Sequence, residues 1–337
     1  MITHIADAMK VPSIIRLDNN LFCLRFETMK IYSALAAVEH LLATGVVKKG
    51  DTLLDSSSGI YAYALALACN KYEMKCHIIA SKTVDKTLMT QLNIMGVHVE
   101  QVPPSATLKM DQSYRVNRIQ EIVRDNPGVH WMQQYHDDIH YLGYAAVARQ
   151  IEQDLGAANL TIVGGVGSGC STGGLVKPLR DIDPSVKLIG VQPFGSVTFN
   201  SDHIEDPGIV IAGIGSGIPF RNVDHTLYDE IQWISFDHGL SGSVDLLRQH
   251  AVFAGLSTGC NYLAARREAA MAADRNILFV AADTGHRYID GVFAHHPDAR
   301  RADELQPTVI EHIDQLQLPW AVMNWNRREF NVAEGTV

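Results

Sequence analysis

The sequence predicts an α/β fold with mostly parallel sheets that helices cover on both faces, and three observations support this prediction. Short apolar runs alternate with segments of helical periodicity almost from end to end, as in strand–helix–strand crossovers. These runs are apolar on both faces, as doubly covered strands must be. The chain has 337 residues, a length that favours two domains or one large α/β unit with an inserted lobe.

The expected elements follow one another in a regular order. The strands are Ser13–Leu17, Phe22–Phe26, Thr52–Asp55, Cys76–Ala80, Val97–Val102, Val129–Gln133, Thr161–Gly164, Leu188–Gln192 and Ile277–Ala282. The helices are Ile31–Ala43, Tyr61–Cys69, Lys86–Met95, Gln112–Arg124, Tyr144–Leu155, Leu175–Arg180, Ser243–Phe253 and Cys260–Ala272. The stretch after about Pro319 has weaker periodicity, so we expect a tail there.

The composition excludes several classes of protein. Hydrophobic residues make up 47% and charged residues 19%, as in a globular chain with a sizeable core. The net charge is −9, and no Lys/Arg run is longer than a pair, so we expect no nucleic-acid partner. The five cysteines are scattered without a CxxC, which predicts neither disulfides nor a zinc knuckle. We find no signal-peptide pattern and no run long enough to cross a membrane, so we expect a cytoplasmic protein without a membrane partner.

A glycine-rich loop is the strongest local signal for a binding site. The segment TIVGGVGSGCSTGGLVKPL, Thr161–Leu179, is an apolar strand, a run of small residues and then a helix. Small residues let backbone N–H groups turn inward, and a helix N-terminus carries partial positive charge, so this pattern favours a phosphate cradle. Ser168, Ser171 and Thr172 can add hydroxyl donors. The segment matches neither Walker A nor GxGxxG, and tight strand-to-helix packing is the alternative interpretation.

This loop and several other motifs carry a family resemblance. GVGSGCSTGG (Gly165–Gly174) resembles the phosphate loop of cysteine synthases and cystathionine β-synthases, G-x-G-T-G-G-T-x-x-G. Further motifs of this family have counterparts in the same order: SSSGIYAYALA (Ser56–Ala66), MQQYHDD (Met132–Asp138), AGIGSGIPFRNVDHTLYDEI (Ala212–Ile231), FAGLSTGCNYLAA (Phe253–Ala265) and ADTGHRYID (Ala282–Asp290). The resemblance covers about residues 10 to 290. It identifies the chain as similar to the fold type II, tryptophan-synthase-β-like enzymes that use pyridoxal 5'-phosphate (PLP).

The resemblance implies two doubly wound α/β lobes with PLP in the cleft between them. The small N-terminal lobe would be residues 27–145, with the Schiff-base lysine and the loop for the substrate carboxylate. The large lobe would be residues 1–26 plus 146–337, with the phosphate loop and the tail after about 319. Members of the family are usually homodimers, so the resemblance also implies a homodimer.

The resemblance implies a role for individual residues. Lys30, in LRFETMKIYSAL (Leu24–Leu35), would form the Schiff base; its flanks Met29 and Ile31 suit a half-buried amine, and a surface lysine at a helix start is the alternative. The phosphate loop would be Gly167, Ser168, Gly169, Cys170 and Ser171, although Cys170 also suits a small buried position. Thr284 would face the ring nitrogen or cap a helix. The substrate carboxylate would contact Ser57, Ser58, Gly59, Tyr61 and Gln134.

Departures from the family pattern favour a specialised branch. The family's K-x-E-x-x-N-P-x-G-S-x-K-D-R approach to the lysine is shortened before Lys30. Ile60 stands where the family has an Asn that contacts the cofactor, and Tyr61 stands where it has Thr. Isoleucine cannot donate a hydrogen bond, so another group must fill that role or the site is retuned. His136 and His140 are spaced i,i+4, but with Asp137 in place of the motif's Glu we expect a solvated loop and no metal.

The reaction that the resemblance implies is β-replacement on an O-activated L-serine, such as O-acetyl- or O-phospho-L-serine. PLP serves there as an electron sink. The product would be cysteine or a specialised non-protein amino acid. Two alternatives stay open: β-elimination by a dehydratase or desulfhydrase, and a non-catalytic binding subunit.

Overall fold

The chain folds into two compact α/β units in a computed structural model, which describes residues 1–82, 84–103, 107–208 and 213–330. The first unit comprises Met1–Val11 and Thr28–Gly143, and the second comprises Pro12–Glu27 and the described residues from Tyr144 to Phe330. These bounds lie close to the expected division at 27 and 145. They differ at the amino terminus, because residues 1–11 belong to the first unit. Lys71 Nζ contacts Asp7 Oδ1 there at 2.7 Å.

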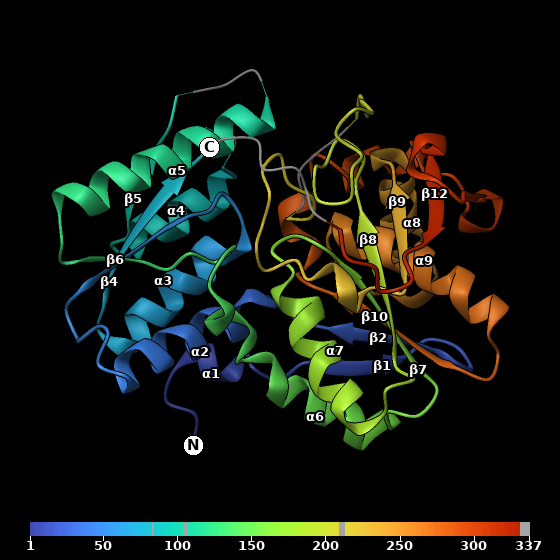
Figure 1. The fold of residues 1–337 in the computed structure, drawn as a ribbon, viewed down its shortest axis with the longest axis horizontal. Helices are drawn as coiled ribbons and strands as arrows, with labels where there is room; N and C mark the ends of the chain where they lie inside the picture. Colours follow the sequence, from blue (N-terminus) through green and yellow to red (C-terminus); the bar gives the residue numbers. More distant parts are fainter. Residues whose placement is uncertain (83, 104–106, 209–212, 331–337) are drawn as a thin grey trace. The chain divides into compact units, whose positions relative to one another are not determined.

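The first unit contains a fully parallel four-stranded sheet in the order β5-β4-β3-β6 (Figure 1). Its strands are β3 (Thr52–Ser56), β4 (Lys75–Ala80), β5 (His98–Gln101) and β6 (Val129–Trp131). Its helices are α1 (Ile5–Ala8), α2 (Lys30–Ala43), α3 (Ile60–Tyr72), α4 (Lys86–Ile94), α5 (Leu108–Asp125) and the 3₁₀ turn η1 (Asp138–Tyr141). Leu54 and Ile79 of the sheet pack with Ile119 and Ile122 of α5 in one buried cluster. Because β3 and β6 pair in parallel, their carboxyl ends lie at the same edge of this sheet.

The second unit contains an eight-stranded sheet in the order β1-β2-β10-β7-β8-β9-β12-β11. Its strands are β1 (Ser13–Arg16), β2 (Leu21–Arg25), β7 (Leu160–Gly165), β8 (Lys187–Gln192), β9 (Glu230–Ile234), β10 (Asn276–Ala281), β11 (Thr308–Val309) and β12 (Trp320–Asn324). Its longer helices are α6 (Tyr144–Leu155), α7 (Cys170–Ile182), α8 (Phe236–His250) and α9 (Leu256–Met271). Short 3₁₀ turns complete it: η2 (His225–Leu227), η3 (Gly285–Tyr288), η4 (Phe293–Asp298), η5 (Ala302–Glu304) and η6 (Ile313–Gln315). The central strands from β2 to β9 pair in parallel. At the two sides, β1 pairs antiparallel with β2, and β12 pairs antiparallel with β9.

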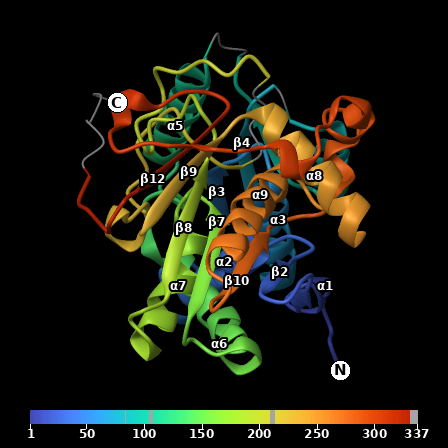
Figure 2. The same ribbon diagram turned by 90° about the vertical axis from the view of Figure 1, so that its right-hand side faces the viewer.

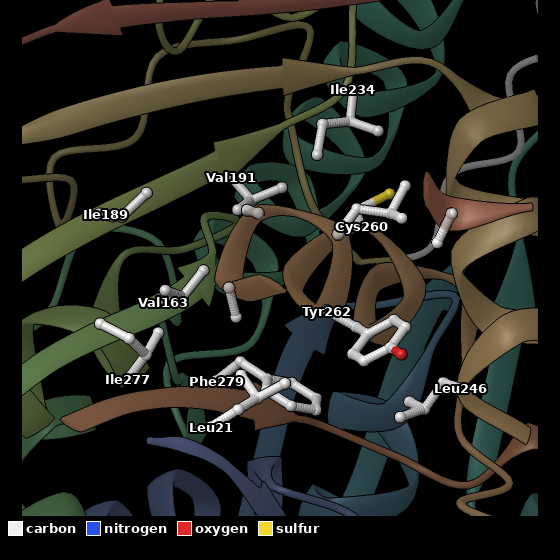
Figure 3. Close-up of a cluster of buried hydrophobic side chains, with 14 of the residues drawn as sticks. Leu21, Val163, Ile189, Val191, Ile234, Leu246, Cys260, Tyr262, Ile277 and Phe279 are labelled. Atoms are coloured by element: carbon white, nitrogen blue, oxygen red, sulfur yellow. The ribbon is translucent and has the colours of Figure 1, made fainter. Parts of the chain in front are cut away.

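Helices cover both faces of this larger sheet, as Figure 2 shows for α7 and α9. Neighbouring residues of a strand point to opposite faces. A Cβ on Gly164 would contact Thr172 of α7, whereas a Cβ on the next residue, Gly165, would lie near Asn261 of α9. On the α9 face, Val163 and Phe279 of the strands pack with Tyr262 and Leu246 of the helices (Figure 3). The prediction of a doubly covered parallel sheet is confirmed.

The expected tail after about Pro319 is wrong for the residues that immediately follow. Trp320–Asn324 form β12, which pairs antiparallel with β9, and the Trp320 side chain is only 2% exposed. The Trp320 Nε1–H donates to Gln232 Oε1 at 3.1 Å. Residues 331–337, the end of the expected tail, lie outside the described residues, as does Ala212 of the Ala212–Ile231 motif.

Several element boundaries also differ from the prediction. Strands β9 and β11 were not expected. Helix α8 begins at Phe236 instead of Ser243, and α7 begins at Cys170 instead of Leu175. Among the helices that the structure describes, none is both long and apolar enough to cross a membrane. All five cysteines are buried and free.

Candidate functional site

Lys30 is the first residue of α2, directly after the N-cap residue Met29. Its side chain is half-buried, and Met29 and Ile31 on either side are buried, as predicted from the sequence. The positive charge of Lys30 is close enough to His140 to contribute to lowering the pKa of that imidazole, after the larger effect of burial. Lys30 therefore presents an amine beside a buried histidine.

The Ser57–Gly59 loop joins the carboxyl end of β3 to the N-terminus of α3. Ser57 Oγ accepts hydrogen bonds from the backbone N–H groups of Gly59 at 3.3 Å and Ala62 at 3.1 Å. Ser58 Oγ accepts one from the N–H of Ser81 at 2.8 Å. A hydroxyl that accepts a hydrogen bond can still donate its own hydrogen, so both side chains can also donate to an anionic ligand. The positive end of the α3 dipole favours an anion at the same place.

Asp55 holds this loop and Gln134 together. Its carboxylate accepts hydrogen bonds from Ser56 N–H at 2.7 Å, Gln134 N–H at 3.0 Å and Trp131 Nε1–H at 3.2 Å. The Gln134 side chain in turn donates from Nε2 to the carbonyl of Ser56 at 2.7 Å. Complete burial raises the pKa of Asp55 to about 7, against the opposing effect of these hydrogen bonds. The structure thus brings together the predicted residues Ser57, Ser58, Gly59 and Gln134.

Tyr61 and His140 form a buried hydrogen-bonded pair that sequence reasoning missed. Tyr61 Oη lies 2.8 Å from His140 Nε2, and the two side chains are 2% and 0% exposed. His140 Nδ1 lies 3.2 Å from the carbonyl oxygen of Asp137, and a carbonyl can only accept. Nδ1 therefore carries the hydrogen, and Nε2 accepts the hydrogen of the Tyr61 hydroxyl. The expected solvated loop is wrong for His140, because Tyr61 covers it.

The imidazole of His140 is held in its neutral form. Burial lowers its pKa to about 4, opposed by the hydrogen bond to Asp137 and reinforced by the charges of Lys30 and His130. A neutral imidazole with a fixed tautomer determines the direction in which the Tyr61 hydroxyl donates its hydrogen. The three side chains of Lys30, Tyr61 and His140 thus form one cluster in the first unit.

In the second unit, the predicted phosphate loop lies between β7 and α7. Gly169 is the N-cap of α7 and has φ +80°, in the left-handed region that favours glycine. A Cβ on Gly169 would lie 2.2 Å from the carbonyl oxygen of Asn222, and one on Gly167 would lie 2.3 Å from that of Gly213. Both glycines are therefore required by close backbone packing. The side chains of Ser168 and Ser171, at 4% and 7% exposed, flank this turn.

Two other residues of this segment are engaged within the protein. Thr172 Oγ1 lies 2.8 Å from Tyr228 Oη and donates to the carbonyl of Gly169 at 3.0 Å. Cys170 is 1% exposed, and its Sγ accepts a hydrogen bond from Asn222 Nδ2 at 3.4 Å. The candidate anion donors are Ser168, Ser171 and the first N–H groups of α7, which helix geometry leaves without partners in the helix.

Thr284 follows β10, which is the parallel neighbour of β7 in the sheet. Because the carboxyl ends of parallel strands meet at one edge, Thr284 and the Gly167 loop lie at the same edge of this unit. Thr284 occupies the N-cap position of η3 without a side-chain cap, and its hydroxyl is 3.1 Å from His286 Nδ1. The adjacent Asp283 is buried, accepts from Tyr288 Oη at 3.2 Å, and has its pKa raised to about 6 by burial.

These residues fit the cofactor that the resemblance implies. PLP requires an amine for its aldehyde and a cradle for its phosphate. The half-buried amine of Lys30 suits the first requirement. The turn at Gly167 and Gly169, with no room for a Cβ at either glycine and a 13-residue helix behind it, suits the second.

Comparison with known proteins agrees with this chemistry. Residues 20–283 match the family described as pyridoxal-phosphate dependent enzyme. The chain is 27% identical to the N-(2-amino-2-carboxyethyl)-L-glutamate synthase of Ralstonia nicotianae, over 76% of this chain and 75% of that protein. It is also 27% identical to a cysteine synthase of Helicobacter pylori, over 73% of this chain and 79% of that protein. The O-acetylserine dependent cystathionine β-synthase of Helicobacter pylori has a similar fold, with a TM-score of 0.77 at 23% identity over 86% of this chain and 98% of that one. The chain therefore belongs to the family of pyridoxal-phosphate dependent enzymes.

Proposed function

We propose that this chain catalyses PLP-dependent β-replacement on an O-activated L-serine and so makes cysteine or a specialised β-substituted alanine. The observation that carries this proposal is the arrangement of the first unit. An anion-binding loop at Ser57–Gly59 starts the same helix, α3, that carries Tyr61 in the cluster with Lys30. An amino acid bound through its carboxylate at this loop would place its α-carbon near the Lys30 amine.

The names of the relatives support the reaction type. Cysteine is alanine with a thiol on its β-carbon, and N-(2-amino-2-carboxyethyl)-L-glutamate carries the alanine skeleton on the nitrogen of glutamate. Both products are thus β-substituted alanines, one with a sulfur substituent and the other with a nitrogen substituent. A chain that resembles both at the same identity suits a β-replacement whose nucleophile is a thiol or an amine.

In the proposed mechanism Lys30 would hold the cofactor through its aldehyde, and its amine would serve as the base for the α-proton. Ser57, Ser58 and the N–H of Gly59 would hold the substrate carboxylate, and Gln134 would fix the loop through its hydrogen bond to Ser56. Ser168, Ser171 and the N-terminus of α7 would hold the phosphate. Bound PLP supplies the electron sink that stabilises negative charge on the α-carbon.

Tyr61 and His140 add a buried hydrogen-bonded pair to the proposed site. Tyr61 stands where the family has Thr, which is too short to form such a pair. Because the Tyr61 hydrogen is directed to His140, the Tyr61 side chain is held in one orientation. We assign this oriented side chain to a contact with the amino-acid substrate. Thr284 would face the ring nitrogen with a neutral hydroxyl, which need not hold that nitrogen protonated and would therefore favour β-chemistry.

Product analysis tests this function directly. The purified holoprotein is given O-acetyl-L-serine or O-phospho-L-serine, with sulfide or L-glutamate as the nucleophile, and the products are identified by mass spectrometry. We expect a new β-substituted alanine whose mass changes with the nucleophile, and none from the Lys30→Ala variant. Pyruvate and ammonia as the main products with every nucleophile would overturn replacement in favour of elimination.

We further propose that the enzyme is a cytoplasmic homodimer, as the family usually is. Sedimentation of the holoprotein at micromolar concentration should give twice the mass of the chain, and a monomer alone would refute the proposal.

A further inference from the structure

A cluster of metal-binding side chains lies on the four-stranded sheet of the first unit. His77 of β4 and His98 of β5 are direct partners in the parallel register, so their side chains point to the same face. Their rings are 4.2 Å apart between centroids. Glu100 is two residues after His98 and therefore shares this face. One donor atom from each of the three side chains lies within 4.8 Å of the others.

The buried nitrogen of His77 indicates that the cluster is suited to a ligand. The side chain of His77 is only 12% exposed, and Nε2 has no hydrogen-bond partner among the described residues. Glu100 Oε2 lies 3.9 Å away, which is too far for a hydrogen bond. A buried imidazole nitrogen without a partner is costly unless a ligand satisfies it.

The cluster is accessible to an ion from solvent. His77, His98 and Glu100 line a cavity of about 630 Å³, whose wall also includes Arg118 and Asn126. His98 is exposed. All of these residues belong to the first unit, so the site is complete within one compact body.

We propose that His77, His98 and Glu100 bind one divalent transition-metal ion, with Zn²⁺ as the best match. Two imidazoles and one carboxylate are a frequent ligand set for zinc, with water in the fourth position. In a tetrahedral site, bond lengths of about 2.0–2.2 Å place two ligand atoms about 3.3–3.6 Å apart, so side-chain rotations that bring the donor atoms together by about 1 Å would close the site. The bound ion would join β4 to the edge strand β5.

Arg118 competes with the ion for Glu100. Its guanidinium contacts Glu100 Oε1 at 2.5 Å and Glu121 Oε2 at 2.9 Å. Metal binding would displace Arg118 from Glu100, while Glu121 can keep it. Arg118 is 41% exposed, so this movement meets little resistance from packing. Removal of its positive charge should strengthen metal binding, which is a result that simple loss of structure would not give.

This site is separate from the residues to which we assign catalysis. His98 begins β5 and His77 lies in the middle of β4, whereas Ser57–Gly59 follow the carboxyl end of β3. An ion at His77 and His98 therefore contacts no residue assigned to PLP or substrate. The ion would stabilise the pairing of β4 with the edge strand β5. If no ion binds there, the proposed reaction is unaffected.

Competition with a chromophoric chelator can measure the Zn²⁺ affinity of the holoprotein. We expect one site per chain that is weakened about 10- to 100-fold or more in both His98→Ala and Glu100→Gln. The Arg118→Gln variant should bind Zn²⁺ more tightly than the wild type. His295→Ala is the matched control, because His295 is exposed and lies 3.8 Å from a single carboxylate, that of Asp298.

The results separate a built site from surface binding. Unchanged Zn²⁺ affinity in His98→Ala, or weaker binding in Arg118→Gln, would overturn the proposal. Equal losses in His295→Ala and His98→Ala would show that exposed histidines bind the ion adventitiously. If His98→Ala does not fold, as judged by circular dichroism, the visible spectrum of Co²⁺ bound to Arg118→Gln decides. A tetrahedral spectrum supports the site, and an octahedral aquo spectrum refutes it.

Discussion

The hydroxyl of Tyr61 lies 2.8 Å from Nε2 of His140, although 79 positions separate the two residues in the sequence. The carbonyl of Asp137 fixes the imidazole tautomer, and burial keeps the ring uncharged. A single hydrogen bond thus determines which way the Tyr61 hydroxyl points. The pair thereby holds Tyr61 in one orientation in the same unit as Lys30.

Replacing Tyr61 by Phe should reduce kcat/KM for the amino-acid substrates about two- to tenfold, because one hydrogen bond of about 0.5–1.5 kcal/mol is lost. His140→Leu should have a similar effect, since it frees the Tyr61 hydroxyl to rotate. Steady-state kinetics with each substrate varied in turn would measure both. The control is Tyr114→Phe, which alters a tyrosine that is 41% exposed on α5. Full activity in Tyr61→Phe would remove this residue from the site.

Lys30→Ala should abolish covalent attachment of PLP, because no other amine stands at the start of α2. Borohydride reduction of the wild-type holoprotein, followed by digestion and mass spectrometry, should place the label on Lys30. The exposed Lys82 is a suitable comparison, and Lys82→Ala should retain the cofactor. A label on any other lysine would refute the assignment.

Gly167→Val should prevent retention of the cofactor. The added Cβ would lie 2.3 Å from the carbonyl oxygen of Gly213, so the loop must move and its N–H groups lose their geometry. Gly128→Val is the control, because no atom lies within 4 Å of a Cβ at that position. Absorbance of PLP after gel filtration gives the measurement, with circular dichroism to check folding. A normal cofactor content in Gly167→Val would place the phosphate elsewhere.

Asp55 should make the stability of the protein depend on pH. Its pKa is about 7 in the folded chain and near 3.8 when exposed, so between these values the folded state binds the proton more strongly. The free energy of unfolding should therefore fall as pH rises from about 4 to 7, by at most about 1.4 kcal/mol per pH unit for this one proton. Asp55→Asn should flatten the slope, as urea unfolding at several pH values would reveal, and Asp181→Asn on the surface should not. An unchanged slope in Asp55→Asn would contradict the assignment.

Much of the fold was predictable because its signals are local. The helix Tyr144–Leu155 was predicted with the bounds that the structure gives it, since its periodicity lies within one segment. The loop from Gly167 to Ser171 was located by its composition, because glycine is required wherever backbone packs this closely.

The features that were missed depend on contacts between distant parts of the chain. Nothing near His140 indicates burial, because the residue that covers it lies on α3. The same holds for β12, whose place in the sheet depends on β9 and on the contact from Trp320 to Gln232. His77 and His98 are 21 positions apart, and only the register of β4 with β5 makes them neighbours.

The pairing of β12 with β9 also means that Trp320–Asn324 protect the edge of β9 from pairing with strands of other molecules. A chain that ended at Pro319 would leave the backbone N–H and C=O groups of Glu230–Ile234 without the partners that Trp320–Asn324 provide. It would also uncover Trp233, which is fully buried. An apolar strand with an open edge recruits strands from other molecules. Proteolysis in this short segment would thus promote aggregation of the protein, although the residues assigned to PLP and substrate would still be present in the chain.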